Sequence, residues 1–340
     1  MIPHSKPTIE KIDKEAIASC LDGGLISRGR ITEKFERDLC LFLDAKYARV
    51  VGSGTSAMIL GLKALGISEV TQEVLLPTYV CTSVSDAVIY CGGKPVYYDN
   101  SLSWTSSLEQ IKAKITSHTA AIIVVHIMGM PNLEVKDIVN LNIPVIEDVC
   151  QAFGGKLSGC NLGSLGKIGV YSFHATKCLT TGEGGAISTN DIDLANKIEN
   201  LYNACINLHS FNDMQATLGI SQLQRYDSFL ERRRYIAEQY FKFLPNWATS
   251  KFRSGADNSV FFRFLLEVEA PFEEIKRKFA DNGIAIRKGV DDLLHRKFGY
   301  DDSEFPNATN SYKKTISIPI YPTLSMEDLD YVISITNKIL

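Results

Sequence analysis

The feature that most constrains the fold of this chain is an alternation of short apolar runs with helical patterns across residues 47–188. The apolar runs lie at 47–51, 73–77, 95–98, 120–126 and 143–148. The helical patterns lie at 54–66, 83–90 and 134–141. Continuous apolar runs, without a polar residue at every second position, are typical of strands buried on both faces of a sheet. The alternation therefore predicts an α/β domain in which a mostly parallel sheet lies between helices.

The pattern changes after residue 188, where long helical segments replace the alternation. The predicted helices lie at 191–204, 213–243, 272–281 and 326–340, and the predicted strands at 260–268, 284–287 and 315–318. A length of 340 residues is ordinary for two domains. We therefore expect a large α/β domain over residues 1–225 and a smaller C-terminal α+β domain over 226–340, connected by the helix at 213–243.

Charge and composition exclude several classes of protein. The formal net charge is −3, whereas a nucleic-acid-binding domain usually carries a strongly basic patch. No apolar run approaches the roughly 20 residues that span a bilayer. The eight cysteines have no CxxC spacing, which argues against a structural zinc site and a disulfide scaffold. With no signal-peptide pattern at the N-terminus, these features predict a cytoplasmic protein with no metal, no membrane partner and no nucleic-acid polymer as partner.

The first candidate site is a glycine turn between a strand and a helix, Val51-Gly52-Ser53-Gly54-Thr55-Ser56-Ala57. The N-terminus of a helix presents unpaired N–H groups and a partial positive charge, so it favours phosphate. An ordinary tight turn explains the same residues. Read as GxGxxA, the turn also resembles a dinucleotide fingerprint, but the next strand ends in Leu75-Leu76-Pro77 and lacks the expected acidic residue.

The second candidate is the pair Glu147-Asp148 at the end of an apolar strand, followed by Gln151. Ligands bind beyond the carboxyl ends of strands in open parallel sheets, so Asp148 lies where a site is expected. Its carboxylate suits a metal, a ribose hydroxyl or a protonated ring nitrogen. A cap of the following helix remains an equal alternative.

The third candidate is the lysine in Tyr171-Ser172-Phe173-His174-Ala175-Thr176-Lys177, which continues into Thr180-Thr181-Gly182-Glu183-Gly184-Gly185. Hydroxyls, a histidine and glycines surround this lysine, and the window has no regular hydrophobic period. Such surroundings suit a lysine that loses its proton and attacks a carbonyl. A plain surface lysine is the alternative. A fourth region, around Arg287 and His295, could contact substrate from the smaller domain or be structural.

Together these motifs resemble the DegT/StrS nucleotide-sugar aminotransferases, which are fold type I pyridoxal-phosphate enzymes related in fold to aspartate aminotransferase. The window from Ser172 to Gly185 is similar to the family's most specific signature. Matches to other family motifs lie at Gly54-Thr55-Ser56-Ala57, Glu147-Asp148 with Gln151-Ala152, and Ile316-Ser317-Ile318-Pro319-Ile320-Tyr321-Pro322. The resemblance covers nearly the whole chain.

The resemblance implies roles for particular residues. Lys177 would form a Schiff base with pyridoxal 5'-phosphate and then move the proton, and Asp148 would pair with the pyridine nitrogen. The other implied cofactor contacts are Gly54, Thr55, Ser56, Tyr79, Cys81, Gln151 and Ser172. The implied substrate contacts are His174, Glu183 and His295.

The resemblance also implies a reaction: L-glutamate would leave its amine on the cofactor, and a nucleotide-diphosphate keto-sugar would accept it in deoxyamino-sugar biosynthesis. The enzyme would be a homodimer in which the partner subunit completes each active site.

Three segments depart from the family pattern. Cys81 stands where an aromatic residue usually stacks on the cofactor ring, so Tyr79 is a possible substitute. The segment Leu208-His209-Ser210-Phe211 replaces an Asn-Tyr-Arg-Met sequence, which leaves Asn207 or His209 as candidates for contacts across the dimer. A His-Tyr-Pro sequence is missing near 287–292.

These departures leave a non-catalytic regulatory or binding protein on the same fold as an alternative. An NAD-dependent dehydrogenase is disfavoured by Lys177 and by the missing acidic residue.

Overall fold

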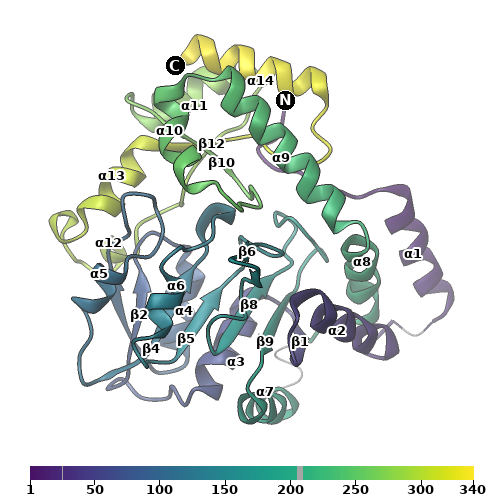
Figure 1. The fold of residues 1–340 in the computed structure, drawn as a ribbon. Helices are drawn as coiled ribbons and strands as arrows, with labels where there is room; N and C mark the ends of the chain where they lie inside the picture. Colours follow the sequence, from purple (N-terminus) through teal and green to yellow (C-terminus); the bar gives the residue numbers. More distant parts are fainter. Residues whose placement is uncertain (25, 205–209) are drawn as a thin grey trace.

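The computed structural model of the protein describes residues 1–24, 26–204 and 210–340. A seven-stranded sheet with the order β1-β9-β8-β5-β4-β2-β3 forms its centre (Figure 1). The strands of this sheet are β1 Tyr47–Val51, β2 Glu73–Pro77, β3 Lys94–Tyr98, β4 Thr119–Val125, β5 Val145–Asp148, β8 Ile168–Ser172 and β9 Gly185–Thr189. Strand β9 pairs antiparallel with both of its neighbours, β1 and β8, and every other pair of neighbouring strands in this sheet is parallel. The predicted mostly parallel sheet is confirmed.

Helices cover both faces of the sheet because its strands are apolar on both sides. Along β2 and β4, alternate residues enter two separate cores: Leu76 and Ile123 belong to one, and Leu75 and Ile122 to the other. The first core is covered by α3 Gly54–Ala64, α4 Thr82–Tyr90 and α7 Ile192–Ala204. The second is covered by α2 Arg30–Leu43, α5 Leu108–Lys112, α6 Val135–Val139 and α8 Asp213–Leu223. The layered α/β class predicted from the apolar runs is therefore correct.

The C-terminal elements form their own antiparallel sheet, with the order β10-β12-β11 (Figure 1, top). Its strands are β10 Phe264–Glu267, β11 Arg287–Lys288 and β12 Thr315–Ile318. The helices of this region are α9 Tyr226–Phe243, α10 Asn246–Gly255, α11 Phe272–Asp281, α12 Leu294–Lys297, α13 Pro306–Lys314 and α14 Met326–Ile339. The N-terminus joins this region, since Ile2 forms a parallel bridge with Ile284, and α1 Lys11–Asp22 then leads back to α8. The division of the chain at residue 225 stays a prediction.

The single helix predicted at 213–243 is wrong, because the chain breaks into α8 and α9 at Gln224 and Arg225. In a continuous helix, the Arg225 amide would donate to the Ser221 carbonyl four residues earlier. Instead, Arg225 Nε donates to that carbonyl at 3.2 Å, and the Arg225 amide donates to Gln222. The same guanidinium forms ion pairs with Glu10 and Asp13, so contacts with α1 stabilise the break.

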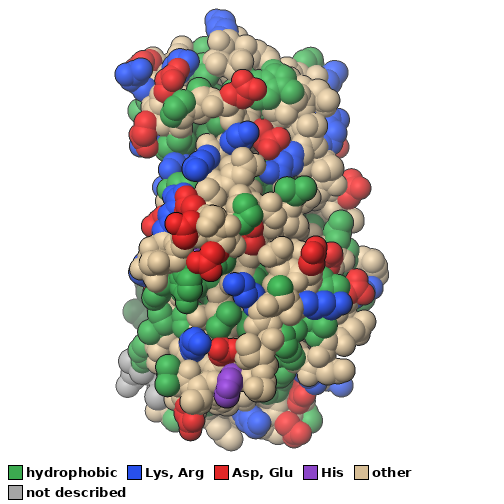
Figure 2. Space-filling view, turned by 90° about the vertical axis from the view of Figure 1, so that its left-hand side faces the viewer, with side chains coloured by type: hydrophobic (Ala, Val, Ile, Leu, Met, Phe, Trp, Pro, Cys, Tyr) green, Lys and Arg blue, Asp and Glu red, His purple; other side chains and the backbone are tan. Residues whose placement is uncertain are grey.

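Charged side chains of both signs are interspersed over the face seen in Figure 2, which agrees with the small net charge. Across the described residues, we find no helix that combines the length and the apolar character needed to cross a membrane.

The two-stranded ribbon formed by β6 Lys156–Leu157 and β7 Cys160–Asn161 connects β5 to β8.

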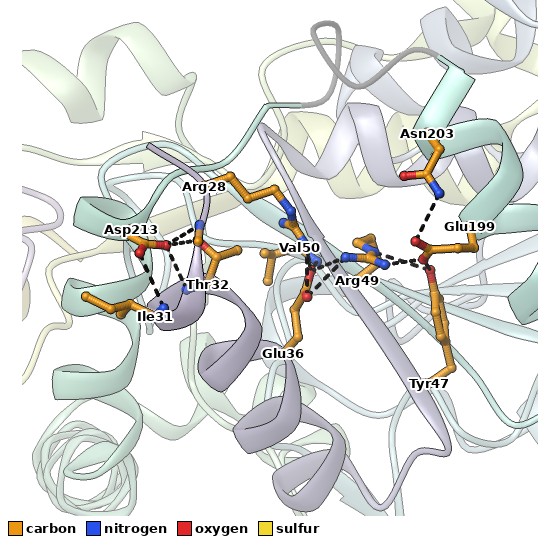
Figure 3. Close-up of polar contacts among 11 residues, drawn as sticks. Arg28, Ile31, Thr32, Glu36, Tyr47, Arg49, Val50, Glu199, Asn203 and Asp213 are labelled. Atoms are coloured by element: carbon orange, nitrogen blue, oxygen red, sulfur yellow. Dashed lines mark hydrogen bonds and ion pairs between the residues drawn. The ribbon is translucent and has the colours of Figure 1, made fainter. Parts of the chain in front are cut away.

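Asp213 ties α8 to the first turn of α2 (Figure 3). Its carboxylate accepts hydrogen bonds from the amides of Gly29 and Thr32 at 2.9 Å, from the Ile31 amide at 3.3 Å and from Thr32 Oγ1 at 2.6 Å. Burial alone would raise the pKa of Asp213, but these hydrogen bonds outweigh it and lower the pKa. A carboxylate from a distant helix thus supplies the cap that Gly29 cannot provide.

We predict that Asp213→Ala lowers the free energy of unfolding by roughly 1–3 kcal/mol, because it leaves first-turn amides of α2 without an acceptor. A depressed folded-state pKa stabilises the fold above the unfolded value of about 3.9 and loses this effect as the pH falls through the folded value. The difference from the wild type should therefore shrink in acid. Urea unfolding at neutral and acidic pH measures it. Asp193→Ala, which removes an exposed first-turn carboxylate of α7, is the matched control, and an equal loss in both variants would contradict the prediction.

Candidate active site

A cavity of about 500 Å³ opens at the carboxyl ends of the central strands. Asp148 is the last residue of β5, Ser172 is the last of β8, and Ser53 and Gly54 follow β1. Each of these residues lines the cavity, together with residues from the C-terminal region such as Phe262. The cavity lies where open parallel sheets usually bind ligands.

The N-terminus of α3 forms one end of the cavity. Ser53 caps this helix, since its Oγ accepts a hydrogen bond from the Ser56 amide at 3.0 Å. Gly54 and Thr55 line the cavity at the first turn. A Cβ on Gly54 would lie 3.0 Å from both Cys150 Sγ and Ser172 Cβ, so a larger residue would push α3 away from β5 and β8. This close packing brings the helix N-terminus beside the strand ends.

Ser56, predicted as a cofactor contact, is not among the residues that line the cavity. Its hydroxyl lies 3.1 Å from Ser53 Oγ, inside the capping arrangement. Ser53 lines the cavity instead and was missed. A serine directly before an apolar helical pattern was the available signal, because serine is a preferred N-cap residue.

Asp148 and Glu147 point to opposite sides of β5, as neighbours on a strand do. Asp148 lines the cavity with 5% of its surface exposed, and its Oδ1 accepts a hydrogen bond from the Cys150 amide at 2.9 Å. A turn, not a helix, follows it, so the predicted helix cap is absent in this described segment. Gln151 also lines the cavity, and its Oε1 accepts a hydrogen bond from the Met128 amide at 2.8 Å.

Glu147 has a structural position beneath the site. Its carboxylate accepts hydrogen bonds from the amides of Gly163, Leu165 and Gly166, and it lies 2.9 Å from His126 Nε2. The Asn132 amide donates to His126 Nδ1, so Nε2 carries the proton that is shared with Glu147. Burial opposes ionisation, yet the His126 hydrogen bond and the amides lower the pKa of Glu147 overall. This buried pair orients β5 and leaves Asp148 as the carboxylate of the cavity.

Lys177 lies in the loop between β8 and β9, and its side chain reaches the cavity. The loop closes on itself: the Phe173 amide donates to the Gly184 carbonyl, and the Thr181 amide donates to the Phe173 carbonyl. Lys177 Nζ lies 4.9 Å from the ring centroid of Phe262. His174 and Glu183 line the same cavity, with His174 Nε2 3.6 Å from Glu183 Oε1. The structure therefore brings Lys177, Asp148, His174 and Glu183 together.

Tyr79, predicted as a possible stacking residue, is absent from the cavity lining, whereas Cys81 is exposed and lines it. Tyr79 is 1% exposed and packs against Gly289. A Cβ on Gly289 would lie 2.0 Å from the Tyr79 hydroxyl oxygen. The phenol thus occupies the space of any side chain at position 289, and the prediction for Tyr79 is corrected.

We predict that Gly289→Ala costs about 1–3 kcal/mol of unfolding free energy, because the new methyl group overlaps the Tyr79 hydroxyl. Tyr79→Phe removes this hydroxyl, which makes no hydrogen bond within the described residues. In the double variant, most of the loss should therefore be recovered. A double-mutant cycle of thermal unfolding measures this coupling, and additive effects would contradict it.

His295, predicted as a substrate contact, is fully buried and does not line the cavity. Its Nδ1 lies 2.8 Å from Thr78 Oγ1 and its Nε2 lies 3.1 Å from Asp302 Oδ1. Its ring stacks on Phe305 at a centroid distance of 4.3 Å. Both ring nitrogens are engaged, one by the residue that follows β2 and one by a residue that follows α12, so His295 is a structural residue and the prediction is corrected.

Two arginines line the cavity from the C-terminal region. Arg287 belongs to the fourth candidate region, whereas Arg263 was missed. A signal for Arg263 existed, since it and Glu267 are the two charged residues inside the otherwise apolar run at 260–268. The predicted strand there begins only at Phe264, which places Arg263 before the strand and beside the cavity.

The segment expected to contact a partner subunit falls partly outside the described residues, which exclude Asn207, Leu208 and His209. Phe211 at its end is buried and stacks on Phe35.

The groups in the cavity fit pyridoxal phosphate. The amides of Gly54 and Thr55 at a helix N-terminus, with the hydroxyls of Thr55 and Ser172, suit a phosphate. The Asp148 carboxylate suits a protonated ring nitrogen, and the Lys177 amine suits an aldehyde. Three chemically different groups of one cofactor thus find partners in one cavity.

Comparisons with known proteins agree with this geometry. The model of the DegT/DnrJ/EryC1/StrS aminotransferase family matches residues 7–337. GDP-perosamine synthase of Escherichia coli O157:H7 is 32% identical, over 99% of this chain and 98% of its own length. The spore coat polysaccharide biosynthesis protein SpsC of Bacillus subtilis is 30% identical, over 99% and 97%. Among solved structures, the aminotransferase TlmJ from Streptoalloteichus hindustanus has a TM-score of 0.89 at 25% identity, covering 100% of this chain and 98% of that one.

The family model matches almost the entire chain, and the relatives align with it over nearly their full lengths. The cavity also contains the groups that pyridoxal phosphate needs. The chain belongs to the DegT/DnrJ/EryC1/StrS aminotransferase family and is an aminotransferase that uses pyridoxal phosphate.

Proposed function

We propose that this enzyme transfers an amino group from L-glutamate to a nucleotide-linked keto-sugar in the biosynthesis of a deoxyamino sugar. The observation that carries the proposal is the meeting of Lys177, Asp148 and the α3 N-terminus in one cavity, in a chain about one-third identical to a GDP-perosamine synthase. A further relative, 28% identical, is a transaminase named for a UDP-linked amino sugar. The relatives therefore support nucleotide sugars as the class of acceptor.

Each residue has a stated task in this proposal. When bound, pyridoxal phosphate supplies a conjugated ring that accepts electrons from the substrate carbon. Lys177 Nζ would move the proton between the substrate carbon that bears the amine and the aldehyde carbon of the cofactor. The Asp148 carboxylate keeps a proton on the ring nitrogen, and Gly54 and Thr55 bind the phosphate at the N-terminus of α3.

Other residues of the cavity orient the reactants. Gln151, whose Oε1 accepts a hydrogen bond from the Met128 amide, would contact the cofactor ring through the rest of its side-chain amide. Ser172 adds a hydroxyl to the phosphate site. His174 and Glu183, which lie close to one another at the cavity, contact the substrate.

The test uses purified protein loaded with pyridoxal phosphate. L-glutamate alone should change the visible absorption of the cofactor and release 2-oxoglutarate, and a panel of nucleotide-linked keto-sugars should then restore the absorption. Mass spectrometry of the sugar product should show the gain of an amine. A protein that takes up the cofactor but gives no reaction with glutamate would favour the regulatory or binding alternative.

We further propose that the enzyme is a cytoplasmic homodimer whose subunits share their active sites. The support is the family membership together with the thiol state of the cysteines, since those in the described residues are free. Light scattering of the holoenzyme should give twice the chain mass of 37.7 kDa. A monomer with full activity would contradict the shared site.

A further inference from the structure

We propose that a second cavity, at the edge of the central sheet, binds a phosphate group, either as the free ion or as the ester of a small molecule. The cavity measures about 490 Å³ and is lined by residues of α2, α7 and the edge strand β1. Among the described residues, it shares no lining residue with the active-site cavity. The inference therefore goes beyond the proposed function and does not depend on it.

A network of charged side chains lines this cavity (Figure 3). Arg28 Nη2 donates to both carboxylate oxygens of Glu36 at 3.1 and 3.0 Å, and Arg49 Nη1 donates to the same oxygens at 3.3 and 3.2 Å. Glu199 pairs with Arg49 and accepts a hydrogen bond from the Tyr47 hydroxyl at 2.9 Å. Both carboxylates are thus held by their partners, so neither is free to turn toward another donor.

Two buried donors of this network have no acceptor within the described residues: Arg28 Nη1 and the hydroxyl of Tyr202. Both residues line the cavity. Tyr202 is 1% exposed, and the guanidinium carbons of Arg28 and Arg49 lie 5.3 and 5.0 Å from its ring centroid. Buried polar groups in native proteins are nearly always bonded to protein, water or an ion. Two neighbouring donors without an acceptor therefore indicate a ligand that supplies acceptors.

The Tyr202 hydroxyl can act as a donor at neutral pH. Burial raises its pKa, although the charges of Arg28 and Arg49 oppose this change. The phenol therefore keeps its proton at pH 7 and can donate it to an oxygen of a ligand.

The charge around the cavity favours an anion. The lining contains more cations than carboxylates, namely Arg28, Arg37, Lys46 and Arg49 against Glu33, Glu36 and Glu199. Because Arg28 and Arg49 pair with Glu36 and Glu199, the exposed Arg37 and Lys46 are balanced only by the exposed Glu33. An excess of positive charge raises the local concentration of anions.

The origin of the donors favours a phosphate over a planar anion. Arg28 precedes α2, Tyr202 belongs to α7, and Lys46 precedes β1, so the donors come from three elements. A tetrahedral phosphate has acceptor oxygens in several directions, whereas the two oxygens of a carboxylate lie in one plane. Guanidinium groups also bind phosphate strongly. The volume is typical of small-molecule sites, so it has room for the remainder of an ester.

The test uses the holoenzyme, in which pyridoxal phosphate already occupies the N-terminus of α3. Titration calorimetry with inorganic phosphate should show saturable binding. Phosphate should also raise the unfolding temperature above its value in sodium chloride of the same ionic strength. Glucose 1-phosphate serves as a second probe: tighter binding of this ester identifies an ester as the ligand, and binding of inorganic phosphate alone identifies the free ion.

Tyr202→Phe is the decisive variant, because it removes the hydroxyl and keeps the ring on which both arginines stack. It should weaken phosphate binding by roughly 10- to 100-fold, since one hydrogen bond to a charged group is lost. Without phosphate, its unfolding temperature should be unchanged or higher, because the lost hydroxyl has no partner in the described residues. A merely structural hydroxyl would give the reverse, a lower unfolding temperature and unchanged affinity. Tyr235→Phe, at an exposed position of α9, is the control.

Lys46→Gln tests the charge at the rim. It should weaken phosphate binding a few-fold, and the effect should shrink as salt is added, because the charge of an exposed lysine is screened. Lys136→Gln, which changes an exposed lysine of α6 outside this cavity, is the matched control.

The absence of saturable phosphate binding to the wild type would overturn the proposal, as would unchanged affinity in both Tyr202→Phe and Arg28→Gln. Acetate that binds as tightly as phosphate would overturn the choice of ligand. If Arg28→Gln does not fold, because it also loses the pair with Glu36, Tyr202→Phe decides the question. If phosphate does not bind and light scattering shows that Arg28→Gln dissociates the enzyme, a second copy of the chain covers these donors and the proposal is wrong.

Discussion

Replacing Lys177 by alanine should remove the visible absorption of the bound cofactor and lower amino transfer by roughly 10⁴-fold. The size follows because this variant loses both the covalent attachment and the group that moves the proton, and a positioned acid–base group alone contributes about 10²- to 10⁴-fold. The fold should be unaffected, since Lys177 lies in a loop, is only partly buried and lines the cavity.

The measurement combines absorption spectra with borohydride reduction and peptide mass spectrometry, which should locate the cofactor on Lys177 in the wild type. Lys156→Ala is the matched control, because Lys156 is an exposed lysine on β6 outside the cavity. A Lys177→Ala protein that keeps the covalent cofactor would show that another amine carries it.

Replacing Asp148 by asparagine should lower amino transfer by about 10²- to 10³-fold while the protein stays folded. The amide keeps an oxygen that can accept the hydrogen bond from the Cys150 amide, so the turn after β5 is preserved. It removes the negative charge, and charge stabilisation in a site that is largely excluded from water contributes about this much to a rate. The expected loss lies in kcat, because the ring nitrogen no longer keeps its proton.

Glu147→Gln separates this electrostatic role from a structural one. Glu147 lies on the opposite side of β5 and binds three amides of the following segment as well as His126. Its variant should lose stability, seen as a lower unfolding temperature, while retaining most of the rate at temperatures where it is folded. Equal loss of rate in both variants would contradict the distinct role of Asp148.

Strands β1 to β5 of the central sheet could be predicted because their signal is local, whereas β8 and β9 were not predicted. Strands β1 and β2 have the same bounds in the prediction and in the structure, and the bounds of β3, β4 and β5 differ by one or two residues. Their apolar runs differ from helical patterns over a few residues, and this difference does not depend on distant contacts. The break between α8 and α9 was not predictable in this way, because it depends on contacts of Arg225 with α1.

The residues of the candidate site also separate into those that a local motif identifies and those that it does not. Lys177, Asp148 and Gly54 could be found because each lies within a short motif that follows or precedes a strand. Tyr79 and His295 were placed incorrectly, since a linear pattern does not show which face of a segment meets a cavity. Tyr79 turns toward Gly289, and His295 turns toward Thr78 and Asp302.

The sequence by itself determined the α/β class, the strands β1 to β5 and the three groups that suit pyridoxal phosphate. Only the tertiary structure decided that Glu147 lies beneath the site, that Cys81 and not Tyr79 lines it, and that Arg263 reaches it from the C-terminal region. The physical reason is range: strand and turn preferences act between neighbours in the chain, whereas a cavity is formed by residues more than 200 positions apart, such as Gly54 and Arg263.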